Sequence, residues 1–167
     1  MTSFVTCDVL DDYPDRNIQV ISPYLNGYTF KRYGKVASFA GEIVTVQCFE
    51  DNSRVKEILA TEGAGKVLIV DGAASMNCAL MGDLIAASAV KNHWNGVIIY
   101  GCVRDVDVLA TLELGIFALA ATPRKSNRQG LGEVNVNIQF GDVNIASGQY
   151  VYADNNGILI VDQPLIK

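Results

Sequence analysis

Short apolar runs recur through the middle of the 167-residue chain, separated by segments in which apolar and polar residues mix. Continuous runs of this kind are typical of strands that are buried on both faces, as in a parallel sheet. They predict four strands, at residues 43–49, 66–70, 96–100 and 116–120.

The segments between these strands have the apolar spacing of helices. Asn52 or Ser53 is a suitable N-cap for the first helix. Residues 80–91, which are rich in alanine, and residues 106–114 predict two more. From residue 66 to residue 120 the order is strand, helix, strand, helix, strand. Because right-handed crossovers join strands that run the same way, we expect a parallel β-α-β-α-β unit.

The C-terminal third changes to alternation of apolar and polar residues. Residues 134–140 predict a half-buried strand by their period of two. Turn-forming residues then separate short strands as far as Val161, which predicts a C-terminal β-meander. The turns are expected at Gly141-Asp142, Ser147-Gly148 and Asn155-Asn156-Gly157. With no internal repeat and no linker, residues 1–167 are predicted to form a single α/β domain of mixed β/β/α type.

The charge balance disfavours a nucleic-acid partner. The net charge is −5, and the 13 basic residues are dispersed along the chain. Neutralising a phosphate backbone requires clustered Lys and Arg. The densest basic group is Arg124, Lys125 and Arg128, which suits a small anion better than a nucleic acid.

Two further features bear on location and redox state. No apolar run approaches the roughly 20 residues of a membrane span, and the N-terminus lacks the layout of a signal peptide, so we expect a cytoplasmic protein with no membrane partner. The four cysteines are widely separated and there is one histidine, so we expect free thiols and no structural zinc site.

Two loops carry residue types suited to ligand binding. In parallel α/β units, ligands bind at the carboxyl ends of the strands, where loops lead into helices. The predicted helix start at Gly82, Asp83, Leu84 and Ile85 offers backbone N–H groups and a favourable dipole to a carboxylate. Arg104, after the next strand, offers a planar fork to a carboxylate or an oxyanion.

Asp83 and Asp105 add hard oxygen ligands suited to Mg²⁺ or Mn²⁺. Each of these residues also has an ordinary structural explanation, because a lone Asp often caps a helix and an Arg-Asp pair at a strand end is commonly solvated. Two acids and one arginine at consecutive strand ends, beside a glycine turn, favour a ligand site over that explanation.

Other motifs are weaker. Residues 63–66 are similar to part of a phosphate loop, but they precede a strand and Val67 stands where a metal-binding Ser or Thr belongs, so we expect a turn. Neither a nucleophile elbow nor a dinucleotide fingerprint is present.

The segments at residues 70–72, 82–86 and 95–105 closely resemble the RraA-like family, which contains regulators of ribonuclease E activity and class II 4-hydroxy-4-methyl-2-oxoglutarate (HMG) aldolases. Twenty residues separate Asp83 from Arg104-Asp105, which matches the family's Asp-x20-Arg-Asp aldolase signature. The likeness extends to residues 40–46 and 152–158.

The resemblance implies a swivelling β/β/α domain that assembles as a homotrimer, with active sites at subunit boundaries. It also implies that residues 82–85 and Arg104 hold a pyruvate-like 2-oxo acid and that Asp105 binds Mg²⁺ or Mn²⁺. Arg104 and Asp83 would be the catalytic residues, with Asp83 beside the waters of the cation. The implied reactions are cleavage of HMG into two pyruvates and decarboxylation of oxaloacetate, which share a pyruvate enolate.

The same resemblance leaves a second function open, a non-catalytic regulator that binds and inhibits ribonuclease E. The length of the chain and residues 152–158 are very similar to those regulators. The bacterial regulator, however, lacks the acid after the arginine, whereas Asp83 and Asp105 are both present here. The complete signature therefore favours the aldolase.

Overall fold

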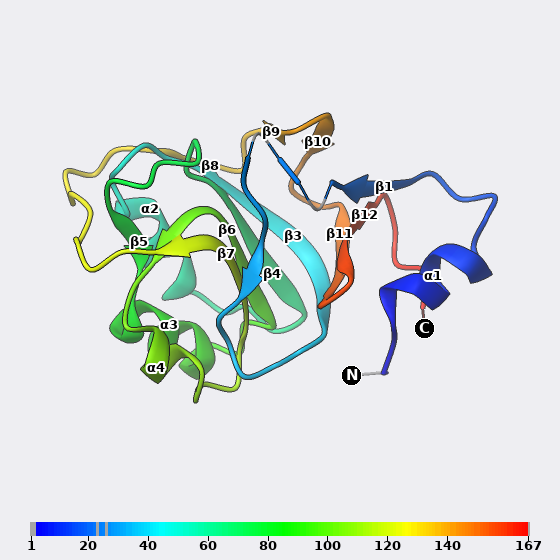
Figure 1. Cartoon of the computed structure of the whole chain (residues 1–167), viewed down its shortest axis with the longest axis horizontal. Coiled ribbons are helices and arrows are strands. Elements are labelled where there is room, and N and C mark those ends of the chain that lie inside the picture. Colours follow the sequence, from blue (N-terminus) through cyan, green and yellow to red (C-terminus); the bar gives the residue numbers. More distant parts are fainter. Residues whose placement is uncertain (1–2, 23, 26, 167) are drawn as a thin grey trace.

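The computed structural model describes residues 3–22, 24–25 and 27–166, and Figure 1 shows one large sheet with short helices around it. The helices are α1 (Thr6–Asp12), α2 (Ser53–Leu59), α3 (Asp83–Lys91) and α4 (Val106–Leu109). The strands are β1 (Ile18–Ile21), β2 (Lys31–Arg32), β3 (Phe39–Gln47), β4 (Lys66–Asp71), β5 (Ala79–Met81), β6 (Gly96–Val103), β7 (Gly115–Ala121), β8 (Glu133–Val134), β9 (Ile138–Phe140), β10 (Val143–Ile145), β11 (Tyr150–Asp154) and β12 (Gly157–Val161). None of the described helices is long and apolar enough to cross a membrane.

Four parallel strands form the middle of the large sheet. They lie in the order β3, β4, β6, β7, and each pairs in parallel with its neighbour. All eight residues of β6 are buried, as its continuous apolar sequence requires. The predicted parallel β-α-β-α-β unit is therefore confirmed.

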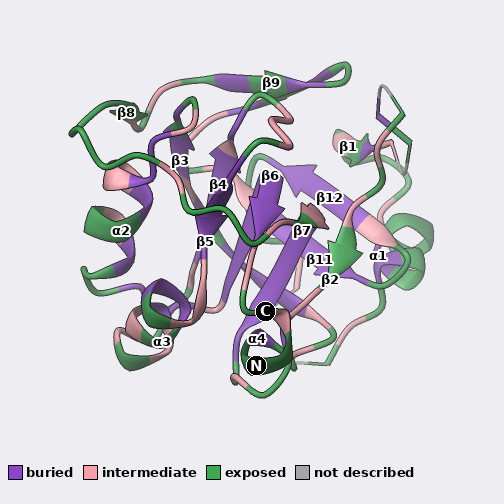
Figure 2. Cartoon of the chain, turned by 60° about the vertical axis from the view of Figure 1, so that its left-hand side comes forward, coloured by how far each residue is buried: buried purple, intermediate pink, exposed green. Residues whose placement is uncertain are grey.

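Each face of these parallel strands is covered by a different layer (Figure 2). On one face, Ile85 of α3 and Leu109 of α4 belong to the same buried cluster as Ile99 of β6. On the other face, Ile69 of β4 shares a buried cluster with Phe140 of β9. A helical layer, a parallel sheet and a layer of antiparallel strands together make the β/β/α arrangement that the sequence predicts.

Where the sequence predicts a meander, the C-terminal strands form two antiparallel hairpins, β9 with β10 and β11 with β12. β9 and β10 form a two-stranded sheet of their own, whereas β11 pairs with β12 and with β3 in the large sheet. The alternating segment 134–140 is interrupted, because Asn135 adopts a left-handed φ of 59° between β8 and β9.

Two predicted helices differ in extent from the observed ones. The helix predicted at residues 80–91 begins at Asp83, because residues 79–81 form β5 beside β6. The helix predicted at residues 106–114 ends at Leu109, after a single turn. Residues 80–82 are apolar or small, so their spacing alone does not separate a short buried strand from the first turn of a helix.

The N-terminal segment contains elements that no pattern predicted. α1 is held to the end of β11 by Thr6, whose hydroxyl and backbone N–H donate to Asp154 at 2.7 and 2.8 Å. Asp154 is buried, and Val9 of α1 lies in the same apolar cluster as Leu159 of β12. A seven-residue helix gives too short a window for periodicity to be recognised.

Phe39 packs between two glycines of neighbouring strands, and this contact gives a test of the core. A Cβ atom added at Gly96 or Gly115 would lie 2.2 or 2.0 Å from the Phe39 ring, which is fully buried. We predict that Gly96→Ala and Gly115→Ala each lower the free energy of unfolding by about 1–3 kcal/mol through overpacking. Urea denaturation measures the change. Gly157→Ala is the control, because its Cβ would have no neighbour within 4 Å, and equal stability of all three variants would contradict the prediction.

Candidate active site

The candidate site lies where β5 and β6 end side by side. Met81 of β5 pairs with Val103 of β6, and the Arg104 backbone N–H donates to the Met81 carbonyl at 3.0 Å. The next residue after Met81 is Gly82, at the start of α3. The two loops that the sequence singles out are thus joined by backbone pairing, although they are 20 residues apart in the chain.

The backbone of the Gly82 turn already binds carboxylates of the chain itself. The Asp83 N–H donates to Asp105 Oδ2 at 3.1 Å, and the Leu84 N–H donates to Asp83 Oδ1 at 2.8 Å. A Cβ added at Gly82 would lie 2.4 Å from Asp105 Oδ2, so glycine is what lets this carboxylate approach the turn. The observed geometry is that of a carboxylate-binding helix start.

Arg104 and Asp105 extend from the end of β6 as a loosely coupled pair. Arg104 Nε lies 3.7 Å from Asp105 Oδ2, and each side chain is 37% exposed. The guanidinium of Arg104 also donates to the Pro123 carbonyl at 3.5 Å. Asp105 adopts a left-handed φ of 57°, which is uncommon for a residue other than glycine and is frequent at functional positions.

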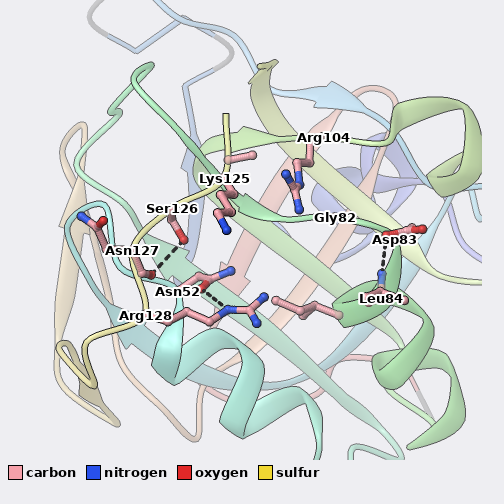
Figure 3. A pocket seen from close by; sticks show the side chains of 11 residues that line it. Asn52, Gly82, Asp83, Leu84, Arg104, Lys125, Ser126, Asn127 and Arg128 are labelled. Carbon is pink, nitrogen blue, oxygen red and sulfur yellow. Dashed lines mark hydrogen bonds between the residues drawn. The ribbon is translucent and has the colours of Figure 1, made fainter. Parts of the chain in front are cut away.

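Arg104 and the Gly82 turn open onto one cavity of about 450 Å³. Figure 3 shows Arg104, Lys125 and Arg128 extending toward the same space, with Leu84 across from them. Of the basic group noted in the sequence, Lys125 and Arg128 line this cavity and Arg124 does not. The cavity wall also contains Asn52, Ala79, Asp83, Ile85, Ser126 and Asn127.

A second hollow of about 220 Å³ adjoins the same arginine. Arg104 and Asp105 line it together with Val106, Thr122 and Pro123, and Ala121 completes the wall. Arg104 therefore borders two spaces, and Asp105 faces the less polar of them.

Asp105, which the sequence predicts to bind a divalent cation, offers a single carboxylate at the end of β6. Among the described residues, no group of three or more His, Cys, Asp or Glu side chains lies together as a metal cluster. A cation at Asp105 would therefore complete its shell with water and ligand oxygens. Mg²⁺ suits such a site, since it keeps several waters and needs only one or two protein carboxylates. The donor set fits the predicted cofactor.

No cysteine lines the cavity in the described part of the chain. Cys48, Cys78 and Cys102 are buried and all four cysteines are free. Burial, with a smaller effect of the nearby Asp51 and Asp71 carboxylates, raises the pKa of Cys48 to about 12. Burial also raises the pKa of Cys78 and Cys102. These thiols stay protonated at neutral pH, so the chemistry of the site rests on oxygen and nitrogen groups.

Two residues of the site were not predicted to belong to it. The sequence predicts Asn52 or Ser53 as the N-cap of α2. Asn52 occupies that position, but its side chain makes no capping hydrogen bond. Instead it donates to the Leu80 carbonyl at 3.2 Å and accepts from Arg128 Nε at 3.1 Å. Asp51 is 1% exposed and accepts from the Ser53 hydroxyl and N–H and from the Gln129 N–H. Ser53 is only two residues from Asp51, but the contacts with Leu80, Arg128 and Gln129 join residues at least 28 positions apart, so no local pattern predicts them.

The fold is a layered β/β/α domain, with the Gly82 turn and the Arg104-Asp105 pair at adjoining strand ends. The chain matches the RraA-like family, described as Aldolase/RraA, over residues 6–160, and it belongs to that family.

Similar proteins cover nearly the whole chain. A relative from Acinetobacter baylyi, provisionally named a 4-hydroxy-4-methyl-2-oxoglutarate aldolase, is 68% identical over 98% of this chain and 96% of its own. A relative from Pseudomonas fluorescens with the same provisional name is 51% identical over 99% of this chain and 98% of its own.

Two solved structures have the same fold. The RNA-processing inhibitor RraA from Thermus thermophilis has a TM-score of 0.89 at 38% identity, covering 99% of this chain and 96% of that one. A structure from Geobacillus kaustophilus, titled as an S-adenosylmethionine:2-dimethylmenaquinone methyltransferase, has a TM-score of 0.91 at 38% identity, covering 97% of each chain.

The buried Asp51 carboxylate gives a test of how the cavity wall is held. Burial raises its pKa, but the hydrogen bonds from Ser53 and Gln129 outweigh burial and hold the pKa below the usual value. Because the folded pKa is lowered, this stabilisation is present at neutral pH and is lost as the pH falls through the folded value, below about 4. Asp51→Asn should remove it at all pH values.

We predict that Asp51→Asn lowers the free energy of unfolding by about 1–3 kcal/mol and speeds amide hydrogen exchange at Gln129 and Gly130 by about tenfold. Hydrogen exchange followed by NMR measures both positions. Asp107→Asn makes the same change at an exposed residue of α4 and should alter neither quantity. Unchanged exchange in Asp51→Asn would show that other contacts hold the segment.

Proposed function

We propose that the chain is a divalent-metal-dependent aldolase that cleaves HMG into two pyruvates and also decarboxylates oxaloacetate. The observation that carries the proposal is the convergence of the Gly82 turn, Arg104 and Asp105 at the joined ends of β5 and β6. Family membership and the provisional names of the relatives support aldolase chemistry in general.

The Gly82 turn and Arg104 would bind the 2-oxo acid part of the substrate. The turn already holds two carboxylates of the chain, and an incoming carboxylate would replace that of Asp83 at the Leu84 N–H. Arg104 supplies a fixed positive charge where negative charge builds up on the 2-oxo oxygen as the carbon–carbon bond breaks. Residues 82–85 and Arg104 thus act on the same end of the substrate.

Asp105 would hold the cation, and Asp83 would assist removal of the proton from the C4 hydroxyl of the substrate. When bound, Mg²⁺ or Mn²⁺ would polarise the 2-oxo group as a Lewis acid and would stabilise the negative charge of the enolate that forms on cleavage. Asp83, once released from the Leu84 N–H, can orient a water that removes the proton of the C4 hydroxyl. In oxaloacetate, loss of CO₂ gives the same enolate without that proton transfer, so Asp83 matters more for cleavage than for decarboxylation.

We predict metal-dependent release of pyruvate from HMG and oxaloacetate, abolished by EDTA and restored by Mg²⁺ or Mn²⁺. Arg104→Ala should lower turnover by roughly 10²–10³-fold, because it removes the fixed charge at the developing oxyanion. Asp105→Asn should remove activation by the metal. A coupled assay of pyruvate with each substrate measures all three.

Arg16→Ala is the matched control, since Arg16 is exposed and lies away from the cavity. It should retain the activity of the unaltered chain. The absence of metal-dependent pyruvate release from either substrate in the unaltered protein would contradict the proposal.

A second function, binding to an RNA-processing nuclease, is favoured by one observation, the 38% identity to the RNA-processing inhibitor RraA. Saturable binding to ribonuclease E that survives both Arg104→Ala and Asp105→Asn would support this function. No binding at micromolar protein would reject it.

We also propose a cytoplasmic homotrimer in which a neighbouring subunit borders the site. Leu84, at the mouth of the cavity, is 81% exposed, and Val108 on α4 is 46% exposed. These residues belong to α3 and α4, which contact each other, so a subunit packed on these two helices would cover both side chains. Sedimentation analysis measures the assembly.

A further inference from the structure

The cavity has an unusual charge for so acidic a chain. Arg104, Lys125 and Arg128 all line it, while the net charge of the protein is −5. No carboxylate among the described residues forms an ion pair with Lys125 or Arg128. Arg104 alone has an acidic neighbour, Asp105. Asp83 also lines the cavity. Lys125 and Arg128 therefore face the cavity without an ion-pair partner in the described part of the chain, and the lining carries three basic side chains against one acidic one.

We propose that Lys125 and Arg128 form a second carboxylate subsite, which makes the cavity selective for 2-oxo acids with a distal carboxylate. The proposal rests on the proposed function for the placement of the 2-oxo acid head at Arg104 and the Gly82 turn. Figure 3 shows the three basic side chains extending toward one space from two separate segments of the chain. A ligand that reaches from Arg104 to Arg128 would then need an anionic group at both ends.

Arg128 is oriented by a buried amide. Its Nε donates to Asn52 Oδ1 at 3.1 Å, and the Asn52 amide nitrogen donates in turn to the Leu80 carbonyl at 3.2 Å. Asn52 is 5% exposed, so its side chain is fixed by packing as well as by these bonds. With Nε occupied, the terminal guanidinium nitrogens of Arg128 remain for a carboxylate, which they can meet with two parallel bonds.

The segment that carries both cations is fixed to the rest of the cavity wall at three places. The Ala79 N–H donates to the Arg124 carbonyl at 2.8 Å, and the Asn127 N–H donates to the Glu50 carbonyl at 2.9 Å. The Asn52 N–H donates to the Asn127 carbonyl at 3.1 Å. Because the backbone is held before a ligand arrives, little ordering opposes binding.

Two five-carbon acids test the subsite directly. 2-Oxoglutarate carries a distal carboxylate, and 2-oxopentanoate has a methyl group in its place. We expect isothermal titration with Mg²⁺ present to show 2-oxoglutarate binding about tenfold or more tightly, since each charge-assisted hydrogen bond contributes on that scale. In the double variant Lys125→Gln, Arg128→Gln the two acids should bind equally, with the affinity for 2-oxopentanoate unchanged. The preference should also weaken at high salt, because both cations are exposed.

The control is Lys31→Gln, Arg32→Gln, which removes the same two charges from the exposed strand β2. It should keep the full preference for 2-oxoglutarate. Equal binding of the two acids by the unaltered protein would overturn the subsite, and so would a preference that survives in the Lys125, Arg128 double variant. The binding results and the pyruvate assay can be told apart. Release of pyruvate together with equal binding of the two acids would overturn the subsite alone. Tighter binding of 2-oxoglutarate without release of pyruvate would overturn the aldolase proposal and leave the subsite standing.

Discussion

The short parallel pairing of β5 with β6 is the interaction on which the candidate site depends. β5 has three residues, yet it aligns Met81 with Val103 and so places the start of α3 against the Arg104-Asp105 corner. The hydrogen bond from the Arg104 N–H to the Met81 carbonyl joins the two strands where they lead into α3 and α4. Without this pairing, Gly82 and Asp105 would lie on separate loops, and no carboxylate-binding turn would face the arginine.

The surroundings of that pairing explain how an acidic protein accommodates an anionic ligand. The Asp105 carboxylate is held on the backbone N–H of Asp83 and lies near Arg104, so its charge is partly offset within the chain. Lys125 and Arg128 face the same cavity from a segment fixed by the buried Asp51 and Asn52. Three basic side chains and one acidic side chain line the cavity, so its lining is net positive although the whole chain carries a net charge of −5.

The sequence was sufficient to predict those parts of the structure that depend on continuous apolar runs and on turn-forming residues. β4, β6 and β7 are buried strands whose composition predicts them directly, and their order along the chain leads to the parallel unit. β5 was missed because Leu80 and Met81 fit a helical face as well as a strand. α1 and β1 depend on contacts with β11 and β12, more than 130 residues away, which no local pattern contains.

The same division holds for the site. Gly82, Asp83, Arg104 and Asp105 could be proposed from residue type and position at strand ends, and the structure brings them together as expected. Asn52 could not be proposed in this way, because it acts through hydrogen bonds with Leu80 and Arg128, which only the folded chain brings close to it. The sequence marks Arg128 only as part of a basic group. Arg128 lines the cavity and Arg124 does not, and this difference depends on the backbone bridge between Lys125 and Ala79 of β5.

The most direct test of this account is a crystal structure of the protein with Mg²⁺ and pyruvate. The account predicts the pyruvate carboxylate on the backbone N–H groups of residues 82–85 and against the Arg104 guanidinium, with the cation on Asp105. A well-ordered pyruvate or cation bound elsewhere, with the Gly82 turn still occupied by Asp83, would contradict it.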